Sequence, residues 1–200
     1  MVLNLAPDQN AVGVALSGGL VTNMPLGFTS FNGTYQSVYT GQREIAVYDY
    51  STDSVIIKSN FEFQDKEKYS LFVTGNKGVY STVVVKDEVD STASAEKAYL
   101  RFINAVPDSA DPVVTITAGD NKVFDAASAF NTVSAFSAVN EGDVTVSISG
   151  VNINASRTIS LQKGGVYTAL VIGDPAKTDT TSKIQIRYIQ NGVVPVSTNK

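Results

Sequence analysis

The sequence contains no histidine, no cysteine and no tryptophan among its 200 residues. Without histidine or cysteine, the chain cannot build a Ser-His-Asp or Cys-His nucleophile system, a zinc finger, an iron–sulfur cluster or a haem site with histidine or cysteine ligation. Disulfide bonds are excluded too, but an extracytoplasmic location is not, since many bacterial envelope proteins lack them. We therefore expect no metal and no cofactor.

Positive charge is scarce as well, with 15 lysines and arginines against 19 aspartates and glutamates and a net charge of −4. No basic stripe is present to neutralise phosphates, so we expect no nucleic-acid partner. No run approaches about 18 apolar residues, so we expect no transmembrane segment in this chain. Hydrophobic residues make up 43% of the sequence, which is enough for a core and too many for a disordered chain.

Helical periodicity is nearly absent, whereas strand patterns recur throughout the chain. Val144, Val146 and Ile148 alternate with polar residues, as in a half-buried strand, and the segment 184–188 alternates in the same way. Residues 166–172 are apolar on both faces, which is typical of a central strand. Glycine, asparagine and aspartate interrupt these runs at short spacing. The pattern predicts an all-β sandwich or barrel.

An internal repeat divides the chain. Four blocks recur in the same order with an offset of about 100 residues: 4–8 with 104–108, 35–41 with 136–142, 69–75 with 167–173, and 83–86 with 184–187. A period of this length is that of a whole small sandwich. We therefore expect two tandem immunoglobulin-like β-sandwich domains, at residues 1–88 and 98–200, joined by a polar linker at 89–97.

The second copy has a strand at residues 99–103 before its Asn-x-x-Pro-Asp turn, whereas the first copy has only Met1 to Leu3. We expect the first strand to be truncated at Met1. We also expect an upstream export segment, which would carry the lipid anchor in a lipoprotein, to have been removed.

The repeated blocks resemble the DUF4397 family, whose members occur as tandem β-sandwich modules in bacterial envelope proteins, many of them Bacteroidetes lipoproteins. The family pattern comprises a strand ending in a Pro-Asp turn, an alternating strand, a Tyr-x-x-Val-x-x-Gly element and a Tyr-Thr strand ending in glycine. Residues 35–41 match the third element fully. Where the family often has histidine before the turn, this chain has Asn4 and Asn104. The resemblance implies a surface-exposed module without established catalysis.

Two recurring features have structural interpretations. In the Pro7-Asp8 and Pro107-Asp108 turns, proline ends a strand and aspartate is expected to accept a hydrogen bond from a nearby backbone N–H. Tyr69 and Tyr167 begin equivalent strands and resemble corner tyrosines, whose hydroxyl group caps a loop backbone.

Paired carboxylates could hydrolyse glycosides without histidine or cysteine. The candidate pairs are Asp49 with Asp53, Asp108 with Asp111, and Asp174 with Asp179. All lie beside turn residues, where aspartate is common, so we expect turn chemistry rather than catalysis. The Asp-x-Asp-x-Asp-Gly spacing of a calcium loop is absent.

Tyrosines are the candidate binding residues, at positions Tyr35, Tyr39, Tyr48 and Tyr50. If Ile45 and Val47 face the core, then Ala46 and the tyrosines at 48 and 50 face outward. Exposed tyrosines can stack on sugar rings or anchor a protein partner, and they can also simply cover a sheet.

Asp-Ser or Asp-Thr followed by a small or apolar residue resembles the O-glycosylation acceptor motif of exported Bacteroidetes proteins. The motif gives four candidate acceptors: Ser54, Ser91, Ser109 and Thr180. All four are predicted to lie in turns or in the linker, where a glycan can be accommodated, although these dipeptides are also ordinary turn sequences.

The sequence thus favours a noncatalytic structural, adhesion or binding module on a bacterial cell surface, with a surface glycan or a protein as its ligand. An accessory glycan-binding surface lipoprotein is the alternative, and a carboxylate-based glycoside hydrolase a less favoured one. A shallow tyrosine surface would distinguish glycan binding from the deep carboxylate cleft of a hydrolase.

Overall fold

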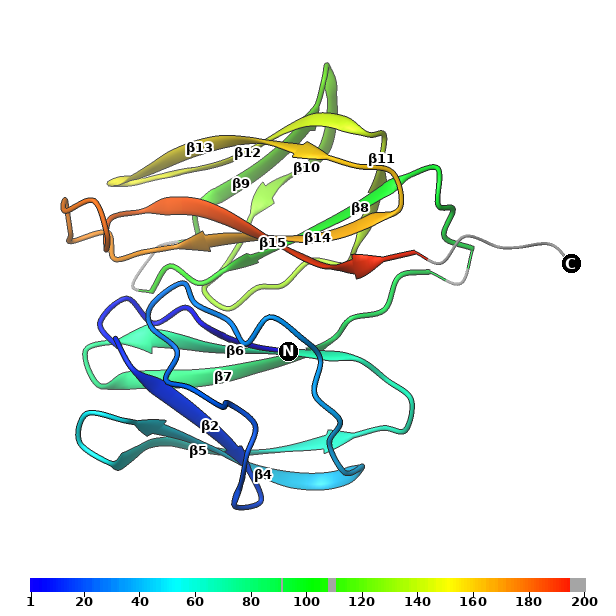
Figure 1. The fold of residues 1–200 in the computed structure, drawn as a ribbon. Helices are drawn as coiled ribbons and strands as arrows, with labels where there is room; N and C mark the ends of the chain where they lie inside the picture. The colour runs from blue at the N-terminus through cyan, green and yellow to red at the C-terminus, as the bar shows by residue number, and fades with distance from the viewer. Residues whose placement is uncertain (91, 108–110, 195–200) are drawn as a thin grey trace, which may run out of the picture. The chain divides into compact units, whose positions relative to one another are not determined.

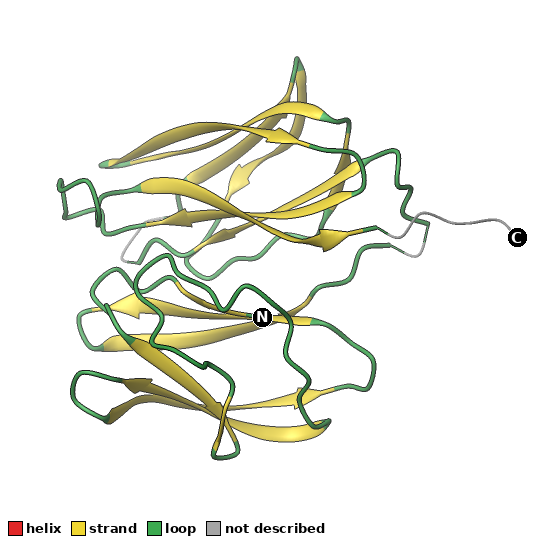
Figure 2. Ribbon diagram, in the orientation of Figure 1, coloured by secondary structure: helices red, strands yellow, loops and turns green. Residues whose placement is uncertain are grey.

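The computed structural model describes residues 1–90, 92–107 and 111–194. Within these ranges the chain forms strands, turns and loops and no helix, so no described helix could cross a membrane (Figure 2). The chain divides into two units, Met1–Glu88 (unit 1) and Val89–Lys200 (unit 2). Each unit contains two β-sheets, as the alternating apolar pattern predicts for a sandwich.

Unit 1 has a sheet of three strands and a sheet of four (Figure 1). The first, in the order β1-β6-β7, comprises β1 (Val2–Asn4), β6 (Tyr69–Asn76) and β7 (Val79–Lys86). The second, in the order β3-β2-β4-β5, comprises β2 (Val12–Leu16), β3 (Gly19–Leu20), β4 (Gly41–Asp49) and β5 (Ser54–Phe63). β1 and β6 pair in parallel.

Unit 2 has two sheets of four strands (Figure 1). The first, in the order β11-β8-β14-β15, comprises β8 (Ala98–Asn104), β11 (Ser137–Val139), β14 (Gly165–Ile172) and β15 (Gln185–Val193). The second, in the order β10-β9-β12-β13, comprises β9 (Val113–Ala118), β10 (Asn121–Ala127), β12 (Gly142–Gly150) and β13 (Ile153–Leu161). β8 and β14 repeat the parallel pairing of β1 and β6.

The core of unit 2 confirms the strand predictions at two places. Val144, Val146 and Ile148 of β12 are buried in it, and the residues between them are not. β14 is buried along its whole length and lies between β8 and β15, as expected of a central strand. The prediction for the last strand was only partly right, because Ile186 is buried whereas Tyr188 is exposed.

Asn4 and Asn104 hold the same place in their units. Each is fully buried at the end of its first strand, and each side-chain oxygen accepts the amide hydrogen of the residue two positions later. The side-chain nitrogen of Asn4 donates to the carbonyl oxygens of Gln9 and Leu26, and that of Asn104 donates to those of Ser128 and Ala129. In both repeats, this asparagine therefore joins the end of the first strand to the backbone around it.

Tyr69 and Tyr167 are equivalent corner tyrosines, as predicted. The hydroxyl of Tyr69 accepts the amide hydrogen of Gln64 at 3.2 Å, and that of Tyr167 accepts the amide hydrogen of Gln162 at 3.3 Å. These matching contacts align the two units residue by residue around the start of β6 and β14.

The prediction for Asp8 was wrong. Its carboxylate does not cap the local turn. It accepts a hydrogen bond of 2.7 Å from the amide of Lys77 and one of 2.9 Å from the hydroxyl of Tyr80, both in the hairpin of β6 and β7. The side-chain oxygen of Asn4 already accepts the amide hydrogen of Ala6 in this turn. The carboxylate of Asp8 therefore connects the turn to the β6–β7 hairpin. Asp108 lies outside the described residues.

Candidate functional site

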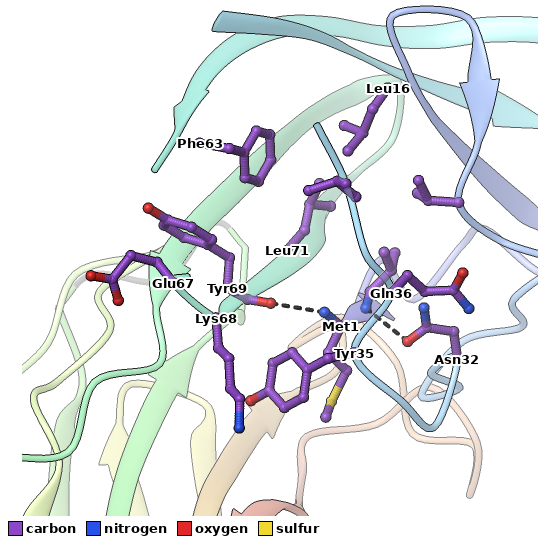
Figure 3. Close-up of a pocket in the computed structure, with 13 residues that line it drawn as sticks. Met1, Leu16, Asn32, Tyr35, Gln36, Phe63, Glu67, Lys68, Tyr69 and Leu71 are labelled. Carbon is purple, nitrogen blue, oxygen red and sulfur yellow. Dashed lines mark hydrogen bonds between the residues drawn. The ribbon is translucent and has the colours of Figure 1, made fainter. Parts of the chain in front are cut away.

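A groove opens in unit 1 beside the first residue of β1 (Figure 3). Its volume is about 80 Å³ and its exposed lining is mainly apolar. It is lined by Met1, Val2, Leu16, Val21, Asn32, Tyr35, Gln36, Val38, Phe63, Glu67, Lys68, Tyr69 and Leu71. At its edge the amino group of Met1 donates a hydrogen bond of 2.8 Å to the carbonyl oxygen of Tyr69.

The amino group of Met1 is largely removed from water at this position. Burial lowers its pKa from the ordinary value of 8.0 to about 6, and the negative charge of Asp87 opposes this effect only in part. The same carboxylate accepts hydrogen bonds from the hydroxyls of Tyr35 and Ser70. Asp87 therefore stabilises the loop that carries Tyr35 against the strands of this sheet.

A second, shallower hollow of about 380 Å³ adjoins the groove. The two share Leu16, Val21 and Val38, and the hollow extends to Tyr39 and Arg43. It lies where the β2–β3 hairpin approaches the segment before β4.

Tyr39 is the most exposed of the predicted binding tyrosines, with 85% of its surface accessible. The guanidinium of Arg43 lies 5.8 Å from the centre of its ring and donates to the carbonyl oxygens of Tyr39 and Thr40. The ring is therefore held in place at low conformational cost, as in aromatic anchors of binding surfaces.

The other three candidate tyrosines do not line the hollow beside Tyr39. Tyr35 lines the groove and is half-buried, with the amino group of Lys68 lying 5.5 Å from its ring centre. Tyr48 is half-buried on β4 and lines neither hollow. The ring of Tyr50 lies on Gly13, where a Cβ atom would come within 2.2 Å of it.

The expectation that residue 46 faces outward with these tyrosines was wrong, because Ala46 is only 3% exposed. It lies on β4, the inner strand between β2 and β5, opposite Ala15 on one side. Two facing methyl groups project little from a sheet, so solvent hardly reaches them. A β-bulge between Val47 and Tyr48 then shifts the register of β4.

Three of the candidate carboxylates accept hydrogen bonds within turns, namely Asp49, Asp174 and Asp179. Asp49 accepts hydrogen bonds from the amide and hydroxyl of Ser51, and these lower its pKa. Asp174 is buried and accepts the amide hydrogen of Ala176. Hydrogen bonds from Thr181 and Ser182 lower the pKa of Asp179 to about 2. Because their pKa values are lowered, Asp49 and Asp179 are poor general acids.

The remaining members of these pairs are Asp53, Asp108 and Asp111. Asp53 occupies the turn between β4 and β5 with a positive φ of 53°, while Asp108 lies outside the described residues. Asp111 is exposed. In the described ranges no three histidine, cysteine, aspartate or glutamate side chains gather as metal ligands.

Two of the four candidate glycosylation sites can be placed. Ser54 begins β5 and is exposed, and Thr180 is exposed in the turn that Asp179 caps. Ser91 and Ser109 lie outside the described residues. The two sites in view have the accessibility that a glycan requires.

The groove is the feature that sequence reasoning missed. Its walls come from residues 1–2, 32–38 and 63–71, which are remote in the chain. Because these segments are distant in the sequence, no local pattern indicates the groove.

Residues 1–111 and residues 98–192 each match the family described as a domain of unknown function, DUF4397. The two matches together cover both units of the chain. No curated protein matches the sequence.

Proposed function

Since the chain belongs to the DUF4397 family through both of its repeats, we propose that it is a noncatalytic binding or adhesion module of the bacterial cell surface. Unit 1 carries the binding surface. The resemblance to envelope proteins supports the location, and the use of carboxylates as turn caps supports the absence of catalysis.

The observation that carries the proposal is the hollow beside Tyr39. It combines an exposed aromatic ring, held by Arg43, with the apolar side chain of Leu20, which is 61% exposed. Large exposed hydrophobic residues are also unevenly distributed in the described ranges. Eight belong to unit 1 and four to unit 2: Leu20, Met24, Phe31, Val38, Tyr39, Tyr50, Val55 and Val79, against Val113, Val151, Tyr188 and Val193. Exposed apolar surface of this kind is typical of interaction sites.

A glycan is the second candidate ligand, favoured by the same ring. Tyr39 exposes its face beside a hollow whose lining mixes polar and apolar groups, including Ser37 and Arg43. Aromatic stacking together with nearby hydrogen-bonding groups suits the alternating apolar and polar faces of a sugar.

The test is an array of cell-surface polysaccharides and extracellular proteins probed with the full chain. Binding by Tyr39→Ala should fall at least about tenfold, as expected for truncation of an aromatic anchor. Tyr188→Ala is the matched control, because Tyr188 is also exposed and lies 5.3 Å from the guanidinium of Arg157, but in unit 2. An equal loss in both variants, or release of sugars from the array, would contradict the proposal.

A further inference from the structure

The hollow beside Tyr39 has a counterpart in unit 2. That second hollow has a volume of about 340 Å³ and lies at the β9–β10 hairpin, as the first lies at the β2–β3 hairpin. Residues 35–41 match residues 136–142 in the repeat, so Asn140, which lines the second hollow, takes the place of Tyr39. Both units therefore have a hollow at this place, and only the side chains around it differ.

The linings of the two hollows differ in the sign of their charge at neutral pH. Arg43 carries the only charge among the described residues that line the hollow of unit 1. The hollow of unit 2 is lined by two carboxylates, Glu141 and Asp143, and by one ammonium group, that of Lys97. A negatively charged ligand is therefore favoured in unit 1 and disfavoured in unit 2.

Arg43 belongs to a segment that is longer in unit 1 than in unit 2. The segment joins the repeated glycine to the first buried residue of the next strand, which are Gly41 and Ile45 in unit 1 and Gly142 and Val144 in unit 2. The cation is therefore a feature of unit 1 alone, because unit 2 has no residue in its place.

The guanidinium of Arg43 is already oriented by the backbone beside it. Its Nε donates to the carbonyl oxygen of Tyr39 at 3.2 Å, and its Nη2 donates to that of Thr40 at 2.5 Å. Nη1 takes part in neither hydrogen bond. The nearby carboxylate of Glu44 is paired with Lys58 at 3.3 Å. A guanidinium held in this way can bind a carboxylate at a small cost in side-chain entropy.

The rest of the lining suits a sugar ring. Tyr39 is largely exposed, so the flat apolar face of a pyranose can stack on it. Ser17 and Ser37 line the same hollow and offer hydroxyl groups for hydrogen bonds to a sugar. The volume of about 380 Å³ falls in the range of about 300–1,000 Å³ that is usual for small-molecule sites.

An acidic peptide fits this surface less well. Extended peptides bind at the edge of a sheet through a ladder of backbone hydrogen bonds. The edge strand at the hollow is β3, which comprises only Gly19 and Leu20. A ladder of this length gives a peptide backbone little to pair with.

We propose that the hollow beside Tyr39 binds a carboxylated sugar of an acidic polysaccharide. The sugar stacks on the ring of Tyr39, its carboxylate pairs with the guanidinium of Arg43, and its hydroxyl groups bond to Ser17 and Ser37. This inference rests on the proposed function, because it names the ligand class of the same hollow.

The test compares acidic polysaccharides with neutral counterparts by calorimetry of the full chain. Polygalacturonate, alginate and hyaluronan are each used beside a form whose carboxylates have been reduced to alcohols. The chain should bind at least one acidic polymer about tenfold or more tightly than its reduced form, because a charge-assisted hydrogen bond is lost on reduction. Equal binding of the two forms would overturn the inference and leave the proposed function intact. Absence of binding to all three acidic polymers would overturn it as well.

Arg43→Gln should abolish the preference for the acidic form, because it removes the cation of the hollow. Arg187→Gln is the matched control: Arg187 is an exposed arginine of β15, and its substitution removes the same charge from unit 2. The control should change the preference less than about twofold. Circular dichroism melts establish that both variants fold.

Tyr39→Ala should weaken binding of the acidic and the reduced form alike, since stacking does not need the carboxylate. Polyglutamate is the probe for an acidic peptide. Binding of polyglutamate as tight as that of the acidic polysaccharides, or a preference for the acidic form that survives in Arg43→Gln, would overturn the inference.

Discussion

The amino group of Met1 and the carbonyl oxygen of Tyr69 form a 2.8 Å hydrogen bond at the edge of the open groove. The amide of Leu71 in turn donates to the carbonyl oxygen of Met1, so the bonding pattern of a parallel ladder reaches the first residue. An amino group that can titrate thus lies where the ladder would otherwise place a backbone amide. The pH dependence of stability follows from this contact.

A polypeptide beginning at Met1 should become more stable as the pH rises from 6 to 8. Burial lowers the pKa of its amino group from 8.0 to about 6, so between these values the unfolded chain binds a proton that the folded chain does not. The free energy of unfolding should rise by about 2 kcal/mol across this range. The chain contains no histidine to titrate in the same window.

Urea denaturation at several pH values measures this dependence. Acetylation of the amino group is the control, because it removes the titrating group and should flatten the profile between pH 6 and 8. A profile that falls with rising pH, or one unchanged by acetylation, would contradict the assignment.

Asn104→Ala should lower the free energy of unfolding by about 3 kcal/mol or more. The substitution leaves the carbonyl oxygens of Ser128 and Ala129 and the amide of Val106 without their buried partner. Asn121→Ala, at an exposed position of β10, should change stability by less than about 0.5 kcal/mol. Equal denaturation midpoints for the two variants would show that the buried hydrogen bonds of Asn104 do not stabilise the fold.

Gly173→Ala should also destabilise unit 2, by about 2 kcal/mol or more. Its φ is 117°, and an added Cβ atom would lie 2.3 Å from the carbonyl oxygen of Lys183. Gly192→Ala is the comparison, because nothing lies within 4 Å of a Cβ atom there and its φ is not positive. Thermal melts of the two variants should therefore diverge, and similar melting temperatures would show that this backbone position is not restrictive.

Protein isolated from its native host should carry glycans at Ser54 or Thr180, the two acceptor candidates that are exposed in the structure. Intact-mass measurement of the wild type and of the double variant Ser54→Ala, Thr180→Ala would detect a difference larger than that of the substitutions. A wild-type mass equal to that of the bare polypeptide would contradict glycosylation of this protein.

The period-2 alternation around Val146 and the apolar run of β14 were readable from sequence because strand burial is a local pattern. The repeat was readable because both copies need the same turn and corner residues, such as Tyr69 and Tyr167. The hydrogen-bond partners of Asp8 could not be predicted from the sequence, because they lie 69 and 72 residues away. The contact of Tyr50 with Gly13 likewise depends on which strands become neighbours.

The candidate site was predictable only in its parts. Tyr39 was among the predicted binding tyrosines, but its contact with Arg43 and the hollow beside it arise from the packing of a hairpin and a loop. The groove depends on bringing together residues 1–2, 32–38 and 63–71. Such pairings between distant segments leave no local pattern in the sequence.

The most direct test of the account is the affinity for a ligand recovered from the array, measured by calorimetry for the full chain, for Tyr39→Ala and for Tyr188→Ala. If unit 1 carries the binding surface beside Tyr39, Tyr39→Ala should weaken binding at least about tenfold, and Tyr188→Ala should change it less than about twofold. Equal affinities of the two variants would contradict the account.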